Sequence, residues 1–150
     1  MKNSVFAAIA VLALASCATT GKDAIEQPES SASGVLGQWS IESINVNDTT
    51  IIVPKEISPD EPRTISFEAD SSFNIQTNCN LMGGQYVVNA DSITMSNMFS
   101  TRMMCPDMSV EESLSVILPQ VNTYSVANDS TILLNTNNAN QYVTLRKLAE

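Results

Sequence analysis

Short apolar segments that alternate with turn residues constrain the fold of this chain more than any other feature. From Gly34 onward, apolar side chains tend to recur at every second position, which is the period of a strand with one buried face. Turn residues such as Asp70-Ser71 and Asn89-Ala90-Asp91 separate these segments. The segments with this character are 36–44, 51–53, 64–68, 73–75, 86–88, 93–95, 123–126, 131–135 and 141–145.

One segment has helical spacing instead. Ser109 and Glu112 have the spacing of a capping box, and Pro119 should kink or end the helix that follows. The apolar residues of its buried face are Val110, Leu114, Ile117, Leu118 and Val121. Together the patterns predict a mainly β domain: a small antiparallel β-barrel or curved sheet of about eight strands with one α-helix packed on it.

The N-terminal residues predict export and lipid attachment. Lys2 precedes an apolar run over residues 5–15, which is the pattern of a secretory signal. The run ends in Leu14-Ala15-Ser16-Cys17, which resembles the bacterial lipobox and implies cleavage before a lipid-bearing Cys17. We therefore expect a signal peptide over 1–16, a lipidated Cys and flexible linker over 17–33, and one domain over 34–150.

The same motif predicts a location in the cell envelope. Acyl chains such as palmitate on Cys17 would anchor the protein in a membrane. Ala18 is not the Asp that resembles an inner-membrane retention signal, so the outer membrane is favoured. Whether the domain faces the periplasm or the cell surface stays open at this point.

Charge and composition exclude several function classes. Lys and Arg together number 7, Asp and Glu 16, and His 0, for a net charge of −9. Such an acidic chain repels phosphate backbones, so we expect no nucleic-acid partner. The lack of His removes the usual Ser-His and Cys-His nucleophiles and the His-based metal sites. We expect no enzyme, no cofactor and no metal.

Two cysteines remain after Cys17. An even pair in an exported chain predicts a disulfide between Cys79 and Cys105, and a redox-active pair is the alternative. A bridge closing a loop of this length should stabilise the fold by ~3.5 kcal/mol.

Three motifs resemble the META domain, the HslJ-like family of bacterial lipoproteins. They are Leu36-Gly37-Gln38-Trp39, then Asn78-Cys79-Asn80 with Gly83 or Gly84 and Tyr86, and finally the stretch Ser100-Thr101-Arg102-Met103-Met104-Cys105-Pro106. The resemblance covers Gly34 to Leu148. It implies a small β-barrel linked to heat shock, antibiotic tolerance or virulence, with Cys79 and Cys105 bridged and no catalytic residue set.

The motif residues that we single out for possible interaction are Trp39, Asn80, Thr101 and Arg102. Arg102 is either an anion-binding residue at the barrel mouth or a structural residue bonded to loop carbonyls, and we favour the structural role. Trp39 either lines a ligand cavity or, as we favour, fills the core.

Five methionines cluster between residues 95 and 108. They either form a soft-metal site or an adaptable binding lip, or they fill the core under the helix, which we favour.

Three dipeptides at predicted turns, Asp48-Thr49, Asp91-Ser92 and Asp129-Ser130, are similar to an O-glycosylation signal of some bacteria. Asp-Ser and Asp-Thr are also ordinary turn dipeptides.

Taken together, these observations predict a non-enzymatic envelope lipoprotein that supports envelope integrity under stress by binding another envelope component. Two alternatives stay open: a barrel that holds a small apolar ligand, and an inhibitor module for a periplasmic hydrolase.

Overall fold

The computed structural model describes residues 34–55 and 62–148. The predicted signal peptide, the lipid site at Cys17 and the linker lie outside the described residues. The described helices lack the length and the apolar composition that a membrane crossing needs.

Nine antiparallel strands and one α-helix make up the described part of the chain. In order they are β1 Gly37–Asn47, β2 Thr50–Ile52, β3 Thr64–Phe67, β4 Ser72–Gln76, β5 Leu81–Asn89, β6 Ser92–Ser100, α1 Ser109–Ile117, the 3₁₀ helix η2 Leu118–Gln120, β7 Val121–Asn128, β8 Thr131–Thr136 and β9 Tyr142–Lys147. The strand order is β2-β1-β3-β4-β5-β6-β7-β8-β9, and β9 also pairs with β1. Eight strands therefore close into a barrel, with β2 as an extra strand, and the predicted fold class is confirmed.

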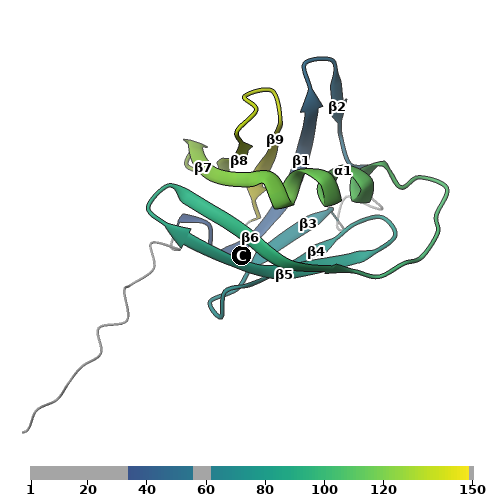
Figure 1. The fold of residues 1–150 in the computed structure, drawn as a ribbon, viewed down its shortest axis with the longest axis horizontal. Coiled ribbons are helices and arrows are strands. Elements are labelled where there is room, and N and C mark those ends of the chain that lie inside the picture. The colour runs from purple at the N-terminus through teal and green to yellow at the C-terminus, as the bar shows by residue number, and fades with distance from the viewer. Residues whose placement is uncertain (1–33, 56–61, 149–150) are drawn as a thin grey trace, which may run out of the picture.

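A bulge in β1 lets this strand close the barrel. Ile41 pairs with Leu145 and Ser43 pairs with Thr144, so Glu42 is one extra residue on the β1 side. The extra residue changes the alternation, and Ile41 and Ile44 are both buried although they lie three positions apart. Beyond the barrel, the end of β1 and β2 form a hairpin that projects away from the body of the molecule (Figure 1).

Apolar side chains fill the interior of the barrel. The largest fully buried ones are Phe67, Phe73, Ile44, Ile65, Ile75, Ile93, Leu114, Ile117, Leu118, Ile132, Leu134 and Leu145. Phe67 lies between two aromatic neighbours, with ring centroids 5.0 Å from Tyr86 and 6.3 Å from Phe73. An eight-strand barrel either packs its interior or holds one small ligand, and this barrel is packed. The alternative of a small apolar ligand inside the barrel is therefore wrong.

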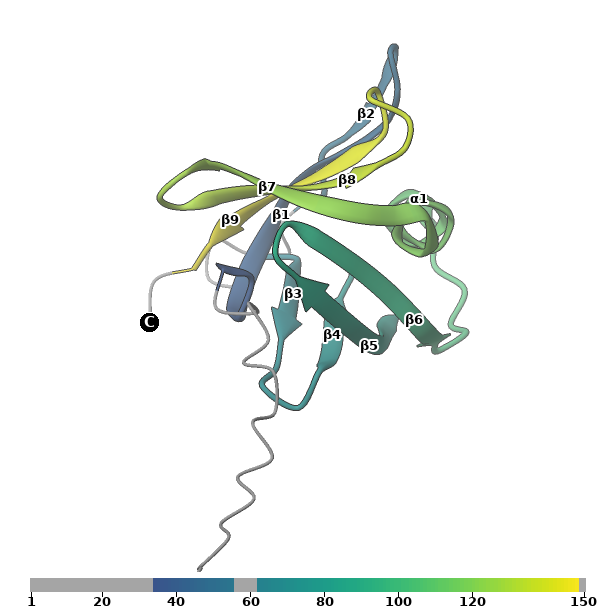
Figure 2. The same ribbon diagram turned by 60° about the vertical axis from the view of Figure 1, so that its left-hand side comes forward.

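Helix α1 covers the place where β6 and β7 diverge. These two strands share a single register pair, Ser92 with Thr123. In both views α1 lies beside the ends of β6 and β7 (Figures 1 and 2). The helix buries Val110, Leu114 and Ile117 there, as its apolar spacing predicts.

The ends of α1 agree only in part with the sequence prediction. The helix ends at Ile117 and continues as η2, in which Pro119 lies, so the predicted stop is confirmed. The predicted capping box is wrong. Its first residue, Ser109, already lies inside the helix and donates from its backbone N–H to Asp107 Oδ1 at 3.1 Å.

Strands β5 and β6 are longer than their apolar patterns predict. Gly83 and Gly84, which interrupt the apolar pattern, belong to β5, and β6 continues opposite them. A Cβ atom on Gly83 would lie 2.7 Å from Phe99 Cζ, and one on Gly84 would lie 2.6 Å from the Ser96 carbonyl oxygen. Glycine therefore permits the close approach of β6 here. A β6 bulge accompanies it, where Asn97 adopts a positive φ of 50°.

Candidate binding groove beside the disulfide loop

The segment that joins β6 to α1, residues 101–108, is called the disulfide loop below. Cys105 in this loop forms a disulfide with Cys79, which precedes β5, and the two Cα atoms are 6.1 Å apart. The structure thus contains the predicted bond. It holds the disulfide loop against the start of β5.

Asn80 fastens the disulfide loop through its side chain. Its Oδ1 accepts hydrogen bonds from Thr101 Oγ1 and from the Met103 backbone N–H, both at 2.8 Å, and its Nδ2 donates to the Met103 carbonyl at 3.1 Å. Thr101 Oγ1 also accepts from the Leu81 backbone N–H at 3.1 Å. Asn80 and Thr101 therefore position the loop.

Glu111 on α1 completes this network and was not among the predicted site residues. Its Oε1 accepts from Thr77 Oγ1 at 2.6 Å and from the Asn80 backbone N–H at 3.2 Å. The side chain is 5% exposed, and among the described residues its Oε2 has no hydrogen-bond partner. A signal was present in the sequence: Glu111 precedes Leu114 by three positions and Leu118 by seven, which places it on the buried face of the helix.

A groove of about 290 Å³ lies between the disulfide loop, the start of β5, the end of β6 and α1. Four methionines, Arg102, Glu111 and Glu112 contribute to its lining. The groove is thus mainly apolar, with charged groups beside it. The methionines are Met82, Met103, Met104 and Met108.

The methionine cluster divides between the core and this groove. Met95 is buried and Met98 packs against the core, as the core-filling interpretation predicts. Met103 and Met104 are 58% and 98% exposed, so the same interpretation is wrong for them. They form an adaptable apolar lip instead, because thioether side chains adjust to many shapes.

Arg102 is exposed, and within residues 34–55 and 62–148 no hydrogen bond or ion pair engages its side chain. The favoured structural role for Arg102 is therefore wrong. Arg63 has that role instead: it is 5% exposed and donates from Nε to the Lys55 carbonyl and from Nη1 to the Thr77 carbonyl. Arg102 itself lies at the groove.

Trp39 is not part of the groove beside the disulfide loop. Its ring is 3% exposed, and its Nε1 donates to the Val35 carbonyl at 2.7 Å. The Lys147 ammonium lies 5.8 Å from the centre of the ring. Trp39 is a core residue, in agreement with the favoured interpretation.

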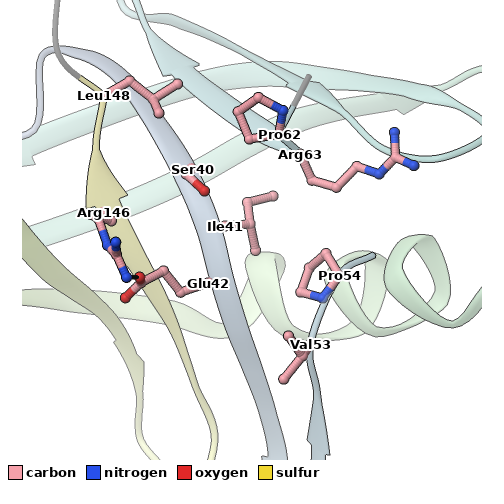
Figure 3. A pocket seen from close by; sticks show the side chains of 9 residues that line it. All are labelled: Ser40, Ile41, Glu42, Val53, Pro54, Pro62, Arg63, Arg146 and Leu148. Carbon is pink, nitrogen blue, oxygen red and sulfur yellow. Dashed lines mark ion pairs between the residues drawn. The ribbon is translucent and has the colours of Figure 1, made fainter. Parts of the chain in front are cut away.

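A second cavity, of about 330 Å³, lies beside β1 and β9 and holds none of the predicted site residues. Figure 3 shows its charged side chains: Arg146 lies against Glu42, and the Arg63 side chain extends away from them. Arg146 is paired with Glu42, and Arg63 is bonded to carbonyls. These charged side chains of the cavity therefore already have partners, unlike Arg102 at the groove.

The loop and a hairpin turn each carry a carboxylate that is stabilised locally. Hydrogen bonds from the side chain and backbone of Ser109 hold the pKa of Asp107 below its usual value. Ser72 lowers the pKa of Asp70 in the same way. Both carboxylates thus stabilise turns.

The three predicted glycosylation dipeptides lie at the tips of the β1–β2, β5–β6 and β7–β8 hairpins. Thr49, Ser92 and Ser130 are exposed there. Two of these hydroxyls, those of Thr49 and Ser130, donate to the side chain of an asparagine two residues before them. Exposure at a turn agrees with modification and with simple turn chemistry alike, so glycosylation stays a prediction.

The groove combines apolar side chains with a guanidinium. Within the described residues, no three Asp, Glu, Cys or His side chains come together as a metal site would require. What the groove presents is an apolar lip, a guanidinium and a positioned loop.

Comparisons with known proteins agree with this fold. The chain resembles an NMR structure of a protein from Burkholderia xenovorans at 16% identity and a TM-score of 0.64, over 79% of this chain and 88% of that one. A second NMR structure matches at 22% identity and a TM-score of 0.54, over 73% and 87%. A crystal structure of a DUF4847 family protein from Bacteroides vulgatus matches at 13% identity and a TM-score of 0.53, over 76% and 94%.

These likenesses concern the fold alone. No curated protein matches the chain. The family model of the META domain matches residues 9–149. The chain therefore belongs to the META domain family.

Proposed function

We propose that this chain is a non-enzymatic, lipid-anchored envelope protein that binds another envelope protein through the groove beside the disulfide loop. Its role is to support envelope integrity under stress, at the outer membrane. The Leu14-Ala15-Ser16-Cys17 motif supports the anchor, and membership of the META family supports the setting.

One observation carries the binding role: Arg102, Met103 and Met104 are exposed on a loop that is fixed on both sides. Cys105 and Asn80 hold the loop in place, so a partner would not have to order it on binding. Arginine and methionine are enriched at protein interfaces, where arginine often supplies much of the affinity. The partner therefore presents an apolar side chain to the methionines and a carboxylate or carbonyl oxygen to Arg102.

Two features favour binding over catalysis. The chain has no His, and the buried carboxylate nearest the groove, Glu111, uses Oε1 to hold Thr77 and Asn80. A general base needs a lone pair directed at the substrate, whereas Oε1 is directed at the protein, and Oε2, which has no partner among the described residues, is buried.

Site-specific photo-crosslinking in cells tests the binding role. A crosslinker at position 104 should capture a defined envelope protein, whereas one at Val126, which is 64% exposed on β7, should not. Arg102→Ala should reduce the capture at position 104 by about tenfold or more, since a hot-spot arginine contributes about 2 kcal/mol. Equal capture at both positions, or capture that ignores Arg102, contradicts the proposal.

Mass spectrometry of the purified cellular protein tests the anchor. We expect a chain that begins at Cys17 and carries acyl groups, and a Cys17→Ser variant that leaves the membrane fraction. An intact, unmodified N-terminus rules the anchor out.

A second candidate function, inhibition of a periplasmic hydrolase, rests on the shape of the same loop. Met104 is 98% exposed on a disulfide-held loop, a form in which a residue can enter a protease or lysozyme cleft. Inhibition across a panel of such hydrolases, lost in Met104→Ala, would favour this candidate over scaffold binding.

A further inference from the structure

A row of side chains runs across the outer face of five strands. Its members, in register order from β1 to β6, are Gln38, Ser66, Asn74, Gly83 and Phe99, and we call them the outer row. Opposed residues on neighbouring antiparallel strands lie on the same face, so these groups are adjacent on the surface. Figure 2 shows β3, β4, β5 and β6 lying side by side in this part of the barrel.

An aromatic ring lies at one end of the outer row. Phe99 is 57% exposed, and its ring lies so close over Gly83 that a Cβ there would be 2.7 Å from Cζ. The β6 bulge sits just before it, where Asn97 Nδ2 donates to Gln85 Oε1 at 2.6 Å. Gly83 thus gives the exposed ring room to lie across a neighbouring strand.

The other side chains of the outer row are polar and uncharged, and they make no hydrogen bonds to the described residues. Within the described part of the chain, the side chains of Gln38, Asn74 and Ser66 have no hydrogen-bond partner, whereas most other side-chain amides do. Gln76, in the next row, is likewise exposed and without a partner among those residues. A groove of about 350 Å³ follows these side chains, and none of its lining residues is charged.

We propose that the outer row binds a neutral saccharide chain. Sugar hydroxyls donate and accept hydrogen bonds, as do the amides of Gln38 and Asn74. The apolar C–H face of a sugar ring packs on an aromatic ring such as Phe99. A charge-free surface on a chain of net charge −9 also matches an uncharged polymer. This inference is independent of the function proposed for the disulfide-loop groove.

Binding of the purified full chain to an array of neutral and acidic polysaccharides tests this proposal. The neutral probes are glucans, mannans, xylans and N-acetylglucosamine oligomers, and polygalacturonate is the acidic probe. We expect binding to at least one neutral probe and weaker binding to polygalacturonate. Binding to none of the neutral probes, or equal binding to all probes, overturns the proposal.

Variants of Phe99 test whether its aromatic ring makes the saccharide contact. Phe99→Ala and Phe99→Leu should each lower saccharide affinity by about tenfold, whereas Phe99→Tyr should keep it, because a sugar face needs the aromatic ring. Saccharide affinity that is unchanged in Phe99→Leu would show that the aromatic ring does not make the contact and would overturn the proposal. Val126→Ala, at a residue that is 64% exposed on β7, is the matched control and should leave affinity unchanged.

Two further measurements complete the test. Asn74→Ala should weaken saccharide binding severalfold, and Arg102→Ala should not affect it, which separates the outer row from the disulfide-loop groove.

Protease treatment of cell envelopes then distinguishes the sources of the sugar. If Phe99-dependent binding survives the treatment, a free or lipid-linked polysaccharide is the ligand. If it is lost but free saccharide had competed for it, the glycan is carried by a protein. Loss of binding for which free saccharide did not compete shows a protein ligand and overturns the proposal.

Discussion

The barrel interior and the disulfide loop are held together in different ways. The interior depends on many apolar side chains, each of which contributes a part of the packing. The disulfide loop depends on one covalent bond and on a few polar side chains, among them Asn78, Asn80, Thr101 and Glu111. The barrel should therefore tolerate small changes at many positions, whereas the position of the loop depends on a few residues.

The largest expected effect lies in the barrel. Phe73 is 0% exposed, and Phe73→Ala should lower the free energy of unfolding by about 3–5 kcal/mol, since it leaves a cavity among packed rings. Urea unfolding measures this. Val87→Ala is the control on an exposed position of β5 and should change stability by no more than about 0.5 kcal/mol. Equal effects of the two substitutions would show that the interior is loosely packed.

The disulfide comes next. Cys79→Ser with Cys105→Ser opens a loop of 26 residues and should cost ~3.5 kcal/mol on the chain-entropy model. In native-state hydrogen exchange, we expect residues of the disulfide loop to lose protection while β8 and β9 keep theirs. Uniform loss across all strands would break the distinction between the two regions.

Substitution of Glu111 should lower the free energy of unfolding by less than loss of the disulfide does. Glu111→Ala removes the Oε1 acceptor that Thr77 Oγ1 and the Asn80 N–H share. It should cost about 1–2 kcal/mol, since Thr77 Oγ1 can still donate to the Asn80 carbonyl and accept from the Asn80 N–H. Glu111→Gln keeps an oxygen at Oε1 and should restore most of this loss. A glutamine variant as unstable as the alanine variant would mean that the hydrogen bonds do not hold the loop.

The smallest effect concerns the exposed hairpin turn at Asp70. Hydrogen bonds from Ser72 lower the pKa of Asp70 below its usual value near 3.8, so the ionised form stabilises the turn. That contribution is present above the usual pKa and is lost as the pH falls through the lowered one. Carboxyl NMR titration should place the pKa of Asp70 below 3.8 and show it rise in Ser72→Ala. An unchanged pKa in that variant would remove Ser72 as the cause.

Much of the barrel was predictable, since strand alternation acts locally. Trp39 and Ile41, and Ile65 and Phe67, reveal their buried face within a few positions. The start of β5 and the end of β6 were not predictable in this way. Gly83 and the bulge at Asn97 interrupt the apolar pattern, and their role emerges only when the two strands pair.

The site was predictable only in outline. The family resemblance singled out Asn80, Thr101 and Arg102, but it could not separate the two residues that fasten the loop from the exposed Arg102. The roles of Glu111 and Arg63 depend on contacts between distant segments, such as the Thr77–Glu111 bond across 34 positions. Local spacing carries no information about such contacts.

The pairing of β1 with β9 has a consequence for how the chain is made. Trp39 lies opposite Lys147, so the first barrel strand is joined to the last. The chain is synthesised from its N-terminus, so one edge of β1 stays unpaired until β9 has been made. Contacts between residues this far apart in the sequence also slow folding. A product that stops short of β9 would expose that edge to strands of other molecules, so premature termination should lead to aggregation rather than to a shorter, working barrel.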